Sequence, residues 1–199
     1  MTVSRKIVLA SSSPRRKSLL NLIGLDFETD KSEFEEDIRA ELSPYKLAQF
    51  LSKEKALSVA YKHKNSIIIA ADTFIEFKGK ILGKPHTAQT AEKMLRLLSG
   101  NKHKVITGFT VLDTKNNRLV SKSVATMVSF RKLAPKQIKA YIRSKEPLDK
   151  AGAYAIQGLG ALLIEKISGD YYNVVGLPIA KLAEVLQEFG VDVWRKNNV

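Results

Sequence analysis

Strand-like and helix-like stretches alternate along this chain, and the first 24 residues already contain a strand, a loop and a helix. Residues 7–10 form a short apolar run that ends in three serines, as a buried strand leading into a loop does. Pro14 suits the first position of a helix, a serine before it can cap that helix, and leucines recur at helical spacing up to Gly24. This order is typical of an α/β protein.

The same alternation continues along the chain and predicts an α/β fold throughout. Residues 67–71 form a second apolar run, which we expect to be a central strand with Asp72 at its end. Residues 74–82 alternate around Lys78-Gly79, as the two arms of a small hairpin do. The other expected elements are helices over residues 44–62, 88–98, 135–142 and 178–189, two strands between residues 103 and 130 joined at residues 115–117, a Gly-rich stretch over residues 152–160 and a strand over residues 162–167.

The composition favours one folded domain over residues 1–199. Hydrophobic residues make up 44% of the chain, enough for a sizeable core, and no repeat, low-complexity tract or linker divides it. The chain has 33 lysines and arginines against 20 acidic residues, a formal charge of +13. Acidic partners are therefore expected, and nucleotides, nucleic acids and anionic membranes all remain open at this level.

Cysteine is absent, which excludes disulfide scaffolds, thiolate zinc sites and thiol nucleophiles and favours a reducing compartment. The longest apolar runs fall far short of the roughly 20 residues that a helix needs to cross a bilayer. Residues 1–10 contain too few apolar residues in a row for a signal peptide. We therefore expect a cytoplasmic protein with no membrane span.

Residues 11–16 combine small hydroxyl side chains, a helix start and two arginines, which makes them a candidate cradle for an anion. The first N–H groups of a helix lack internal partners, and the helix dipole favours negative charge there. Arg15 and Arg16 add forked donors that match phosphate oxygens, and Ser13 precedes the helix. A capped surface helix with solvated arginines is the alternative interpretation.

Two acidic features are candidates for catalysis or metal binding. Asp72 follows an apolar strand, where open α/β sheets place their ligands, so it is a candidate metal ligand or general base. A helix cap or turn residue is the alternative for Asp72. The cluster of Glu33, Glu35, Glu36 and Asp37 supplies the oxygen ligands that a magnesium site needs, and a solvated acidic turn is its alternative.

Three further polar side chains are candidates for substrate contacts. Lys84 is locked between Gly83 and Pro85, which makes it a better candidate for a fixed phosphate contact than lysines that merely face water. Lys55 lies towards the end of the second expected helix. Gln157 offers an amide that can pair with a nucleobase edge, or that can brace its own loop.

Taken together, these segments resemble the Maf family, whose fold is similar to that of the inosine triphosphatase group. The resemblance spans about residues 7 to 190 and keeps every signature position. It implies a mixed, elongated sheet flanked by helices, two lobes around a central cleft, and a homodimer. The matching positions are residues 9–16, Leu19, Leu20, residues 71–73, 83–85 and 98–100, His103, Val105, Thr107, and residues 146–154, 156–158 and 175–178.

The resemblance implies metal-dependent hydrolysis of a nucleoside triphosphate to the monophosphate and diphosphate. By similarity, Asp72 accepts a proton from the water that attacks the α-phosphorus and also contacts the metal. Glu36, together with Glu35, is implied to help carry Mg²⁺ or Mn²⁺. The residues implied to hold the triphosphate and to neutralise the leaving diphosphate are Ser13, Arg16, Lys55 and Lys84.

Arg15, Thr73 and Gln157 occupy the positions that sort substrates within the family. The Ala-Gly-Ala-Tyr and Ile-Gln-Gly segments resemble the dTTP/UTP branch, whereas a glutamate stands in place of Gln157 in the branch that acts on 7-methyl-GTP. A glutamine presents both a donor and an acceptor to a pyrimidine edge. The resemblance therefore implies dTTP, UTP or a modified pyrimidine nucleotide as the substrate.

A basic nucleic-acid-binding regulator linked to cell division is the alternative function. It predicts salt-sensitive binding to DNA or RNA. Against it, the basic residues are spread along the chain, and no nucleic-acid module with interleaved aromatic residues is recognisable. We therefore expect a nucleotide rather than a nucleic acid as the partner.

Overall fold

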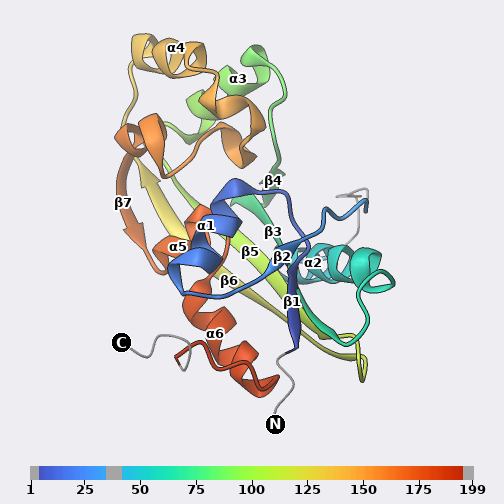
Figure 1. Cartoon of the computed structure of the whole chain (residues 1–199). Helices are drawn as coiled ribbons and strands as arrows, with labels where there is room; N and C mark the ends of the chain where they lie inside the picture. The colour runs from blue at the N-terminus through green and yellow to red at the C-terminus, as the bar shows by residue number, and fades with distance from the viewer. Residues whose placement is uncertain (1–4, 35–41, 195–199) are drawn as a thin grey trace. The chain divides into compact units, whose positions relative to one another are not determined.

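The computed structural model describes residues 5–34 and 42–194, which form a seven-stranded mixed sheet with flanking helices (Figure 1). The strand order is β2-β1-β3-β5-β6-β7, and β4 pairs with β3 outside this path. The predicted α/β fold and mixed sheet are confirmed. The strands are β1 (Lys6–Leu9), β2 (Glu28–Thr29), β3 (Ser66–Phe77), β4 (Lys80–Leu82), β5 (Lys102–Asp113), β6 (Arg118–Phe130) and β7 (Ile164–Ser168). The α-helices are α1 (Pro14–Leu22), α2 (Pro44–Ala60), α3 (Ala88–Leu98), α4 (Pro135–Arg143), α5 (Tyr171–Val175) and α6 (Ile179–Glu188).

The contacts divide the chain into two compact units. Unit 1 contains Met1–Asp72, Thr107–Val124 and Gly176–Val199. Unit 2 contains Thr73–Ile106 and Ala125–Val175. The three long strands β3, β5 and β6 each begin in one unit and end in the other.

Unit 1 is built on the parallel pair of β1 and β3. Ile67 and Ile69 of β3 pair with Ile7 and Leu9 of β1. Because side chains alternate along a strand, the even-numbered residues share one face. On that face Ile68 and Ala70 pack with residues of α2 in a buried cluster whose members are Val8, Ala10, Ala56, Val59, Ile68, Ala70 and Leu112. Helices α1 and α6 are drawn on the other side of these strands (Figure 1).

Helix α2 begins where the sequence predicts it. Ser43 caps it by accepting a hydrogen bond from the Lys46 N–H, and Pro44 occupies its first turn. Burial along the helix falls on one face, which contains Leu47, Leu51 and four other residues. The helix therefore presents a fixed face to the sheet, and this sets the direction in which Lys55 points.

Unit 2 is built on the hairpin of β3 and β4 and on the ends of β5 and β6. Ile75 pairs with Leu82 and Phe77 with Lys80, so the hairpin predicted around Lys78-Gly79 is confirmed. Helices α3 and α4 lie side by side in this unit (Figure 1). Their inward side chains join a buried cluster that contains Ile75, Phe77, Ala91, Leu95, Leu98, Val105, Val128, Phe130, Leu133, Ile138, Tyr141, Ala153, Tyr154 and Leu163.

Two short elements and one strand start differ from the expectation. β2 and α5 have two and five residues, too few for periodicity to reveal them. The strand expected from residue 162 begins at Ile164, because Gly158–Leu163 forms the 3-10 helix η3. Two more 3-10 helices, η1 (Glu146–Asp149) and η2 (Ala151–Ala153), precede it. Within the described residues, every helix is too short or too polar to span a membrane.

Candidate active site

Asp72 lies inside β3 and not at its end, so the expected strand end was wrong. The extended backbone continues through Thr73 to Phe77, because the apolar residues after Asp72 favour a strand and pair with β4 from Ile75 onward. Asp72 follows Ile68 and Ala70 at two-residue spacing, so its side chain points to the face that α2 covers. It is 6% exposed, and a carboxylate buried to that degree needs a partner.

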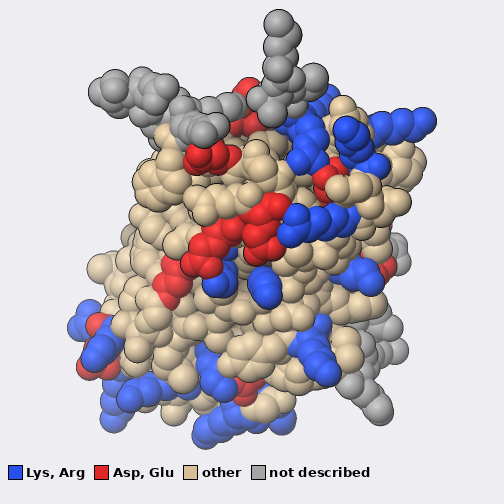
Figure 2. All heavy atoms as spheres, turned by 90° about the horizontal axis from the view of Figure 1, so that it is seen from below, with Lys and Arg blue, Asp and Glu red and all other residues tan. Residues whose placement is uncertain are grey.

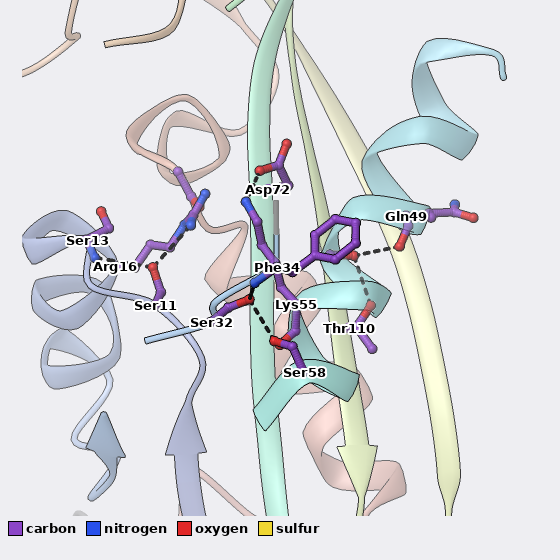
Figure 3. Close-up of polar contacts among 12 residues, drawn as sticks. Ser11, Ser13, Arg16, Ser32, Phe34, Gln49, Lys55, Ser58, Asp72 and Thr110 are labelled. Carbon is purple, nitrogen blue, oxygen red and sulfur yellow. Dashed lines mark hydrogen bonds and ion pairs between the residues drawn. The ribbon is translucent and has the colours of Figure 1, made fainter. Parts of the chain in front are cut away.

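Lys55 of α2 provides that partner. Its ammonium nitrogen forms an ion pair with Asp72 Oδ1, and the two side chains are 12% and 8% exposed (Figure 3). Burial strengthens the attraction between the charges but removes their hydration, so loss of either partner is costly. The pair is therefore a buried couple of opposite charges held between α2 and β3.

The loop between β1 and α1 is held by hydroxyl and guanidinium hydrogen bonds. Ser11 Oγ accepts from the Ser13 N–H and from Arg16 Nη1, both over 3.2 Å (Figure 3). Arg16 Nε also donates to the Gly176 carbonyl over 3.0 Å. The expected serine cap was wrong, because the Ser13 side chain makes no cap hydrogen bond to α1. Ser13 takes part in this loop through its backbone N–H, which donates to Ser11 Oγ.

This loop and Asp72 both follow the point where the parallel pairing of β1 with β3 ends. Leu9 and Ile69 are register partners, and the Ala10 N–H donates to the Ile69 carbonyl over 2.8 Å. The loop begins after Leu9, and Asp72 follows Ile69 by three residues, so both come just after the last paired residues of β1 and β3. Figure 3 draws four predicted residues of unit 1 in one view, namely Ser13, Arg16, Lys55 and Asp72. Arg15 is half-buried and is the second residue of α1.

Three further predicted residues, Lys84, Thr73 and Gln157, belong to unit 2. Lys84 is exposed and follows β4, and its loop is tied to the 148–152 stretch by two backbone bonds. In these bonds the Gly152 N–H donates to the Gly83 carbonyl over 2.9 Å, and the His86 N–H donates to the Leu148 carbonyl over 3.3 Å. Thr73 is half-buried next to Asp72, and Gln157 is exposed immediately before η3.

The expected metal ligands are described in part. Glu35, Glu36 and Asp37 lie outside the described residues, whereas Asp72 lies within them. Residues 5–34 and 42–194 contain no group of three or more His, Asp or Glu placed to hold a metal ion. Glu33 is exposed and lies 3.8 Å from the Lys62 ammonium. The Asp72 carboxylate has the oxygen chemistry that a hard divalent cation prefers.

Two contacts beside the site were missed by sequence reasoning. His63 Nε2 lies 2.9 Å from Asp30 Oδ2, and the hydroxyls of Ser32 and Ser58 are 2.7 Å apart. The contact of Ser32 with Ser58 anchors the segment that leads into Phe34 to α2, the helix that carries Lys55 (Figure 3). The partners are separated by 33 positions in the first contact and by 26 in the second. Local sequence patterns do not report contacts over such separations, so no local signal could have found them.

A separate hollow in unit 2 contains none of the predicted residues. Its volume is about 640 Å³, and its wall includes both basic and acidic side chains. The lining residues are Gly100, Phe130, Arg131, Lys132, Ile164 and Glu165. We place the candidate site at the Lys55–Asp72 pair and not at this hollow, because the hollow lacks a buried charged group.

Comparison with known proteins agrees with this architecture. The solved structure of the Ham1 protein of Staphylococcus aureus aligns with a TM-score of 0.50 at 15% identity, covering 92% of this chain and 99% of that one, and shares the fold. A dTTP/UTP pyrophosphatase of Methanococcoides burtonii is 48% identical over 191 residues, covering 96% of this chain and 98% of the relative. A dTTP/UTP pyrophosphatase of Bacillus cereus is 47% identical over 189 residues, covering 95% of this chain and 98% of the relative. The profile of the family described as "Maf-like protein" matches residues 6–189, and this chain belongs to that family. The family membership predicted from the sequence motifs is confirmed.

Proposed function

We propose that this chain, as a cytoplasmic homodimer, hydrolyses dTTP or UTP to the nucleoside monophosphate and diphosphate. The observation that carries the proposal is the buried Lys55–Asp72 pair, which, like the loop of Ser13 and Arg16, follows the point where the pairing of β1 with β3 ends. The names of relatives nearly half identical over almost the whole chain support the substrate. Cell fractionation tests the compartment.

Asp72 is the proposed proton acceptor. A water oxygen forms a bond to the α-phosphorus while the bond from that phosphorus to the bridging oxygen of the β-phosphate breaks, and diphosphate leaves with the electron pair. Asp72 takes the proton that the water loses. Its burial and its contact with Lys55 hold the carboxylate in one orientation, which favours a directed proton transfer.

Four side chains are proposed to hold the triphosphate. Ser13 and the first N–H groups of α1 offer donors, and Arg16 adds a guanidinium already oriented by Ser11 and Gly176. Lys55 and Lys84 neutralise the charge that develops on the leaving diphosphate. The contribution of Lys84 is favoured by its loop, whose backbone is tied to the neighbouring stretch at Gly83.

A divalent cation, Mg²⁺ or Mn²⁺, completes the proposal. Asp72 and Glu36, with Glu35, are its proposed ligands, and the carboxylate chemistry of these side chains fits such an ion. When bound, the ion neutralises phosphate charge and makes the α-phosphorus easier to attack. The chain's own residues bind and orient the triphosphate, and Asp72 accepts one proton from the attacking water.

Base selection is proposed to depend on Arg15, Thr73 and Gln157. The amide of Gln157 can donate to one atom of a pyrimidine edge and accept from another. Its exposed position before η3 leaves the side chain outside the packed core of unit 2.

The nucleic-acid-binding alternative has no comparable observation in its favour. Figure 2 shows lysines and arginines scattered in small groups over one face, with acidic side chains among them rather than a single basic patch. A formal charge of +13 also suits attraction of a highly anionic nucleotide.

Replacing Asp72 with Asn tests the proposed reaction. We expect diphosphate release from dTTP and UTP in the presence of Mg²⁺ to fall about 1,000-fold, because the amide cannot accept the proton. A coupled assay for diphosphate measures the rate, and circular dichroism checks that the variant is folded. Wild-type protein that releases no diphosphate from any nucleotide would end the proposal.

Asp113→Asn is the matched control for this experiment. Asp113 is likewise a buried carboxylate in unit 1, 3% exposed at its side chain and paired with Arg5, but it lies at the far end of β5 from the candidate site. We expect it to lose stability while keeping activity per folded molecule. Equal loss of activity in both variants would show that Asp72 acts through the fold and not through the reaction.

A further inference from the structure

The loop that carries Gln157 is closed by a side chain from another segment. Gln157 occupies the position before η3, where a side chain commonly caps the first free N–H groups. Within the described part of the chain, the Gln157 side chain makes no such cap hydrogen bond. Glu146, at the start of η1, accepts these bonds instead. Its Oε2 accepts from the Leu159 N–H over 3.1 Å and its Oε1 from the Gly160 N–H over 3.0 Å.

Tyr141 of α4 holds the other side of the same loop. Its hydroxyl donates to Glu146 Oε1 over 2.9 Å and accepts from the Ala155 N–H over 3.2 Å. Burial raises the pKa of Tyr141, so the hydroxyl keeps the proton that it donates to the carboxylate. The residues on both sides of Gln157 are therefore fixed by one connected pair of side chains.

The glycines around Gln157 show how closely this support fits. Gly158 has φ +74°, and a Cβ there would lie 2.8 Å from Glu146 Oε2. A Cβ at Gly160 would lie 2.1 Å from the Ala155 carbonyl oxygen. A Cβ at Gly160 would collide with backbone, and one at Gly158 would press on the Glu146 carboxylate, so the loop is packed directly against its support.

We propose that Glu146 and Tyr141 are positioning residues that set base preference by holding the loop of Gln157 in one conformation. Glu146 takes over the capping of η3, and this leaves the Gln157 amide for a ligand. The inference rests on the proposed function, in which Gln157 reads the base. It extends that function to two residues that act through the loop and do not touch the nucleotide.

Glu146→Gln and Tyr141→Phe test the inference. An amide in place of the carboxylate has one oxygen to offer two N–H groups, and phenylalanine removes both contacts of the hydroxyl. We expect the ratio of kcat/KM for dTTP to that for dCTP to fall about tenfold in Glu146→Gln, because the reading group is misplaced. The two nucleotides have the same sugar and phosphates, and they differ at the base. The double variant should lose little more than Glu146→Gln alone, because both residues support one loop.

Two controls separate positioning from general destabilisation. Glu92→Gln makes the same chemical change on the surface of α3, where Glu92 pairs with Arg96. Val128→Ala removes packing from the buried cluster of unit 2 without touching the loop. Both variants should keep the wild-type ratio of kcat/KM for dTTP to that for dCTP. Val128→Ala should keep it although its melting temperature is lower.

Amide hydrogen exchange provides a readout that does not depend on catalysis. The Leu159 and Gly160 amides should exchange about tenfold faster in Glu146→Gln than in wild type, while the amides of α3 keep their rates. Unchanged exchange at these amides, or an unchanged base ratio in both variants of an active enzyme, would overturn the inference. An inactive wild-type protein would overturn the proposed function and with it the role in base preference, while the exchange rates still decide whether Glu146 supports the loop.

Discussion

His103 is a buried residue of unit 2 whose ring is surrounded by aromatic side chains. It is 2% exposed, and its Nε2 lies 2.7 Å from the Tyr154 hydroxyl. Its ring meets those of Phe130 and Tyr154 edge to face, with centroids 5.1 and 5.3 Å away. Burial lowers the pKa of His103 to about 4, so the ring is neutral in the folded protein at pH 7.

We predict that His103 makes unit 2 sensitive to acid. The unfolded chain binds a proton at this residue near pH 6.5, whereas the folded chain binds it near pH 4. Stability is therefore complete above about pH 6.5 and is lost as the pH falls towards 4, by about 3 kcal/mol from this group. His103→Gln, which cannot titrate, should show a smaller fall in the free energy of unfolding between pH 7 and pH 4.5. Parallel pH profiles for the two proteins in urea denaturation would contradict this prediction.

At the scale of elements, the packing of α2 against β5 determines where Lys55 lies. A Cβ at Gly108 of β5 would lie 2.0 Å from the Ala48 carbonyl oxygen of α2, so the helix backbone rests directly on the strand. Next to this contact the buried hydroxyls of Ser52 and Thr110 are 2.9 Å apart. Close backbone approach and a polar contact together fix the helix on the sheet.

Gly108→Ala should therefore displace α2. We expect the free energy of unfolding to fall by about 3 kcal/mol, because backbone atoms rather than a flexible side chain must move. Diphosphate release should also fall, since Lys55 moves with the helix. Chemical denaturation and the diphosphate assay measure both effects.

Gly79→Ala is the control for the loss of a glycine. Gly79 lies in the β3–β4 turn with φ +78° and nothing within 4 Å of its Cβ position, so the expected cost is about 1 kcal/mol with activity kept. If Gly108→Ala and Gly79→Ala had the same free energy of unfolding, the close packing of α2 on β5 would be disproved.

At the scale of the whole molecule, the proposed homodimer has a candidate contact surface on α2. Phe50, Leu57 and Tyr61 lie on one side of this helix by their spacing and are 38%, 41% and 71% exposed. Exposed apolar side chains gathered on one helix face are typical of protein contacts. The helix thus presents its buried face to the sheet and these three apolar side chains to solvent.

Light scattering tests the dimer and this surface together. We expect the wild-type mass to equal two chains and the mass of Leu57→Lys to equal one, because a charge would be buried in the contact. Leu97→Lys, at a 45% exposed leucine of α3, should keep the wild-type mass. A wild-type mass of one chain would contradict the proposed homodimer. A Leu57→Lys variant that remains dimeric would contradict the proposed contact surface on α2.

Much of the fold and part of the site could be predicted from local sequence patterns. Apolar runs and alternation located β1, β3 and the hairpin at Lys78-Gly79, and Pro44 marked the start of α2. The end of β3 was misplaced because a charged residue in an apolar strand looks like a boundary. The strand continues past Asp72 because the residues after it pair with β4 from Ile75 onward, and Lys55 compensates the buried charge.

The sequence by itself determined the α/β class, most element boundaries and the family, because these depend on side-chain periodicity and on motifs of neighbouring residues. The tertiary structure alone decided which distant groups meet. Lys55 contacts Asp72 because α2 packs on the even-numbered face of β3, and Glu146 reaches Leu159 and Gly160 because η1 and η3 lie together. Periodicity reports which face of an element is buried, but the partner across that face depends on how the whole chain packs.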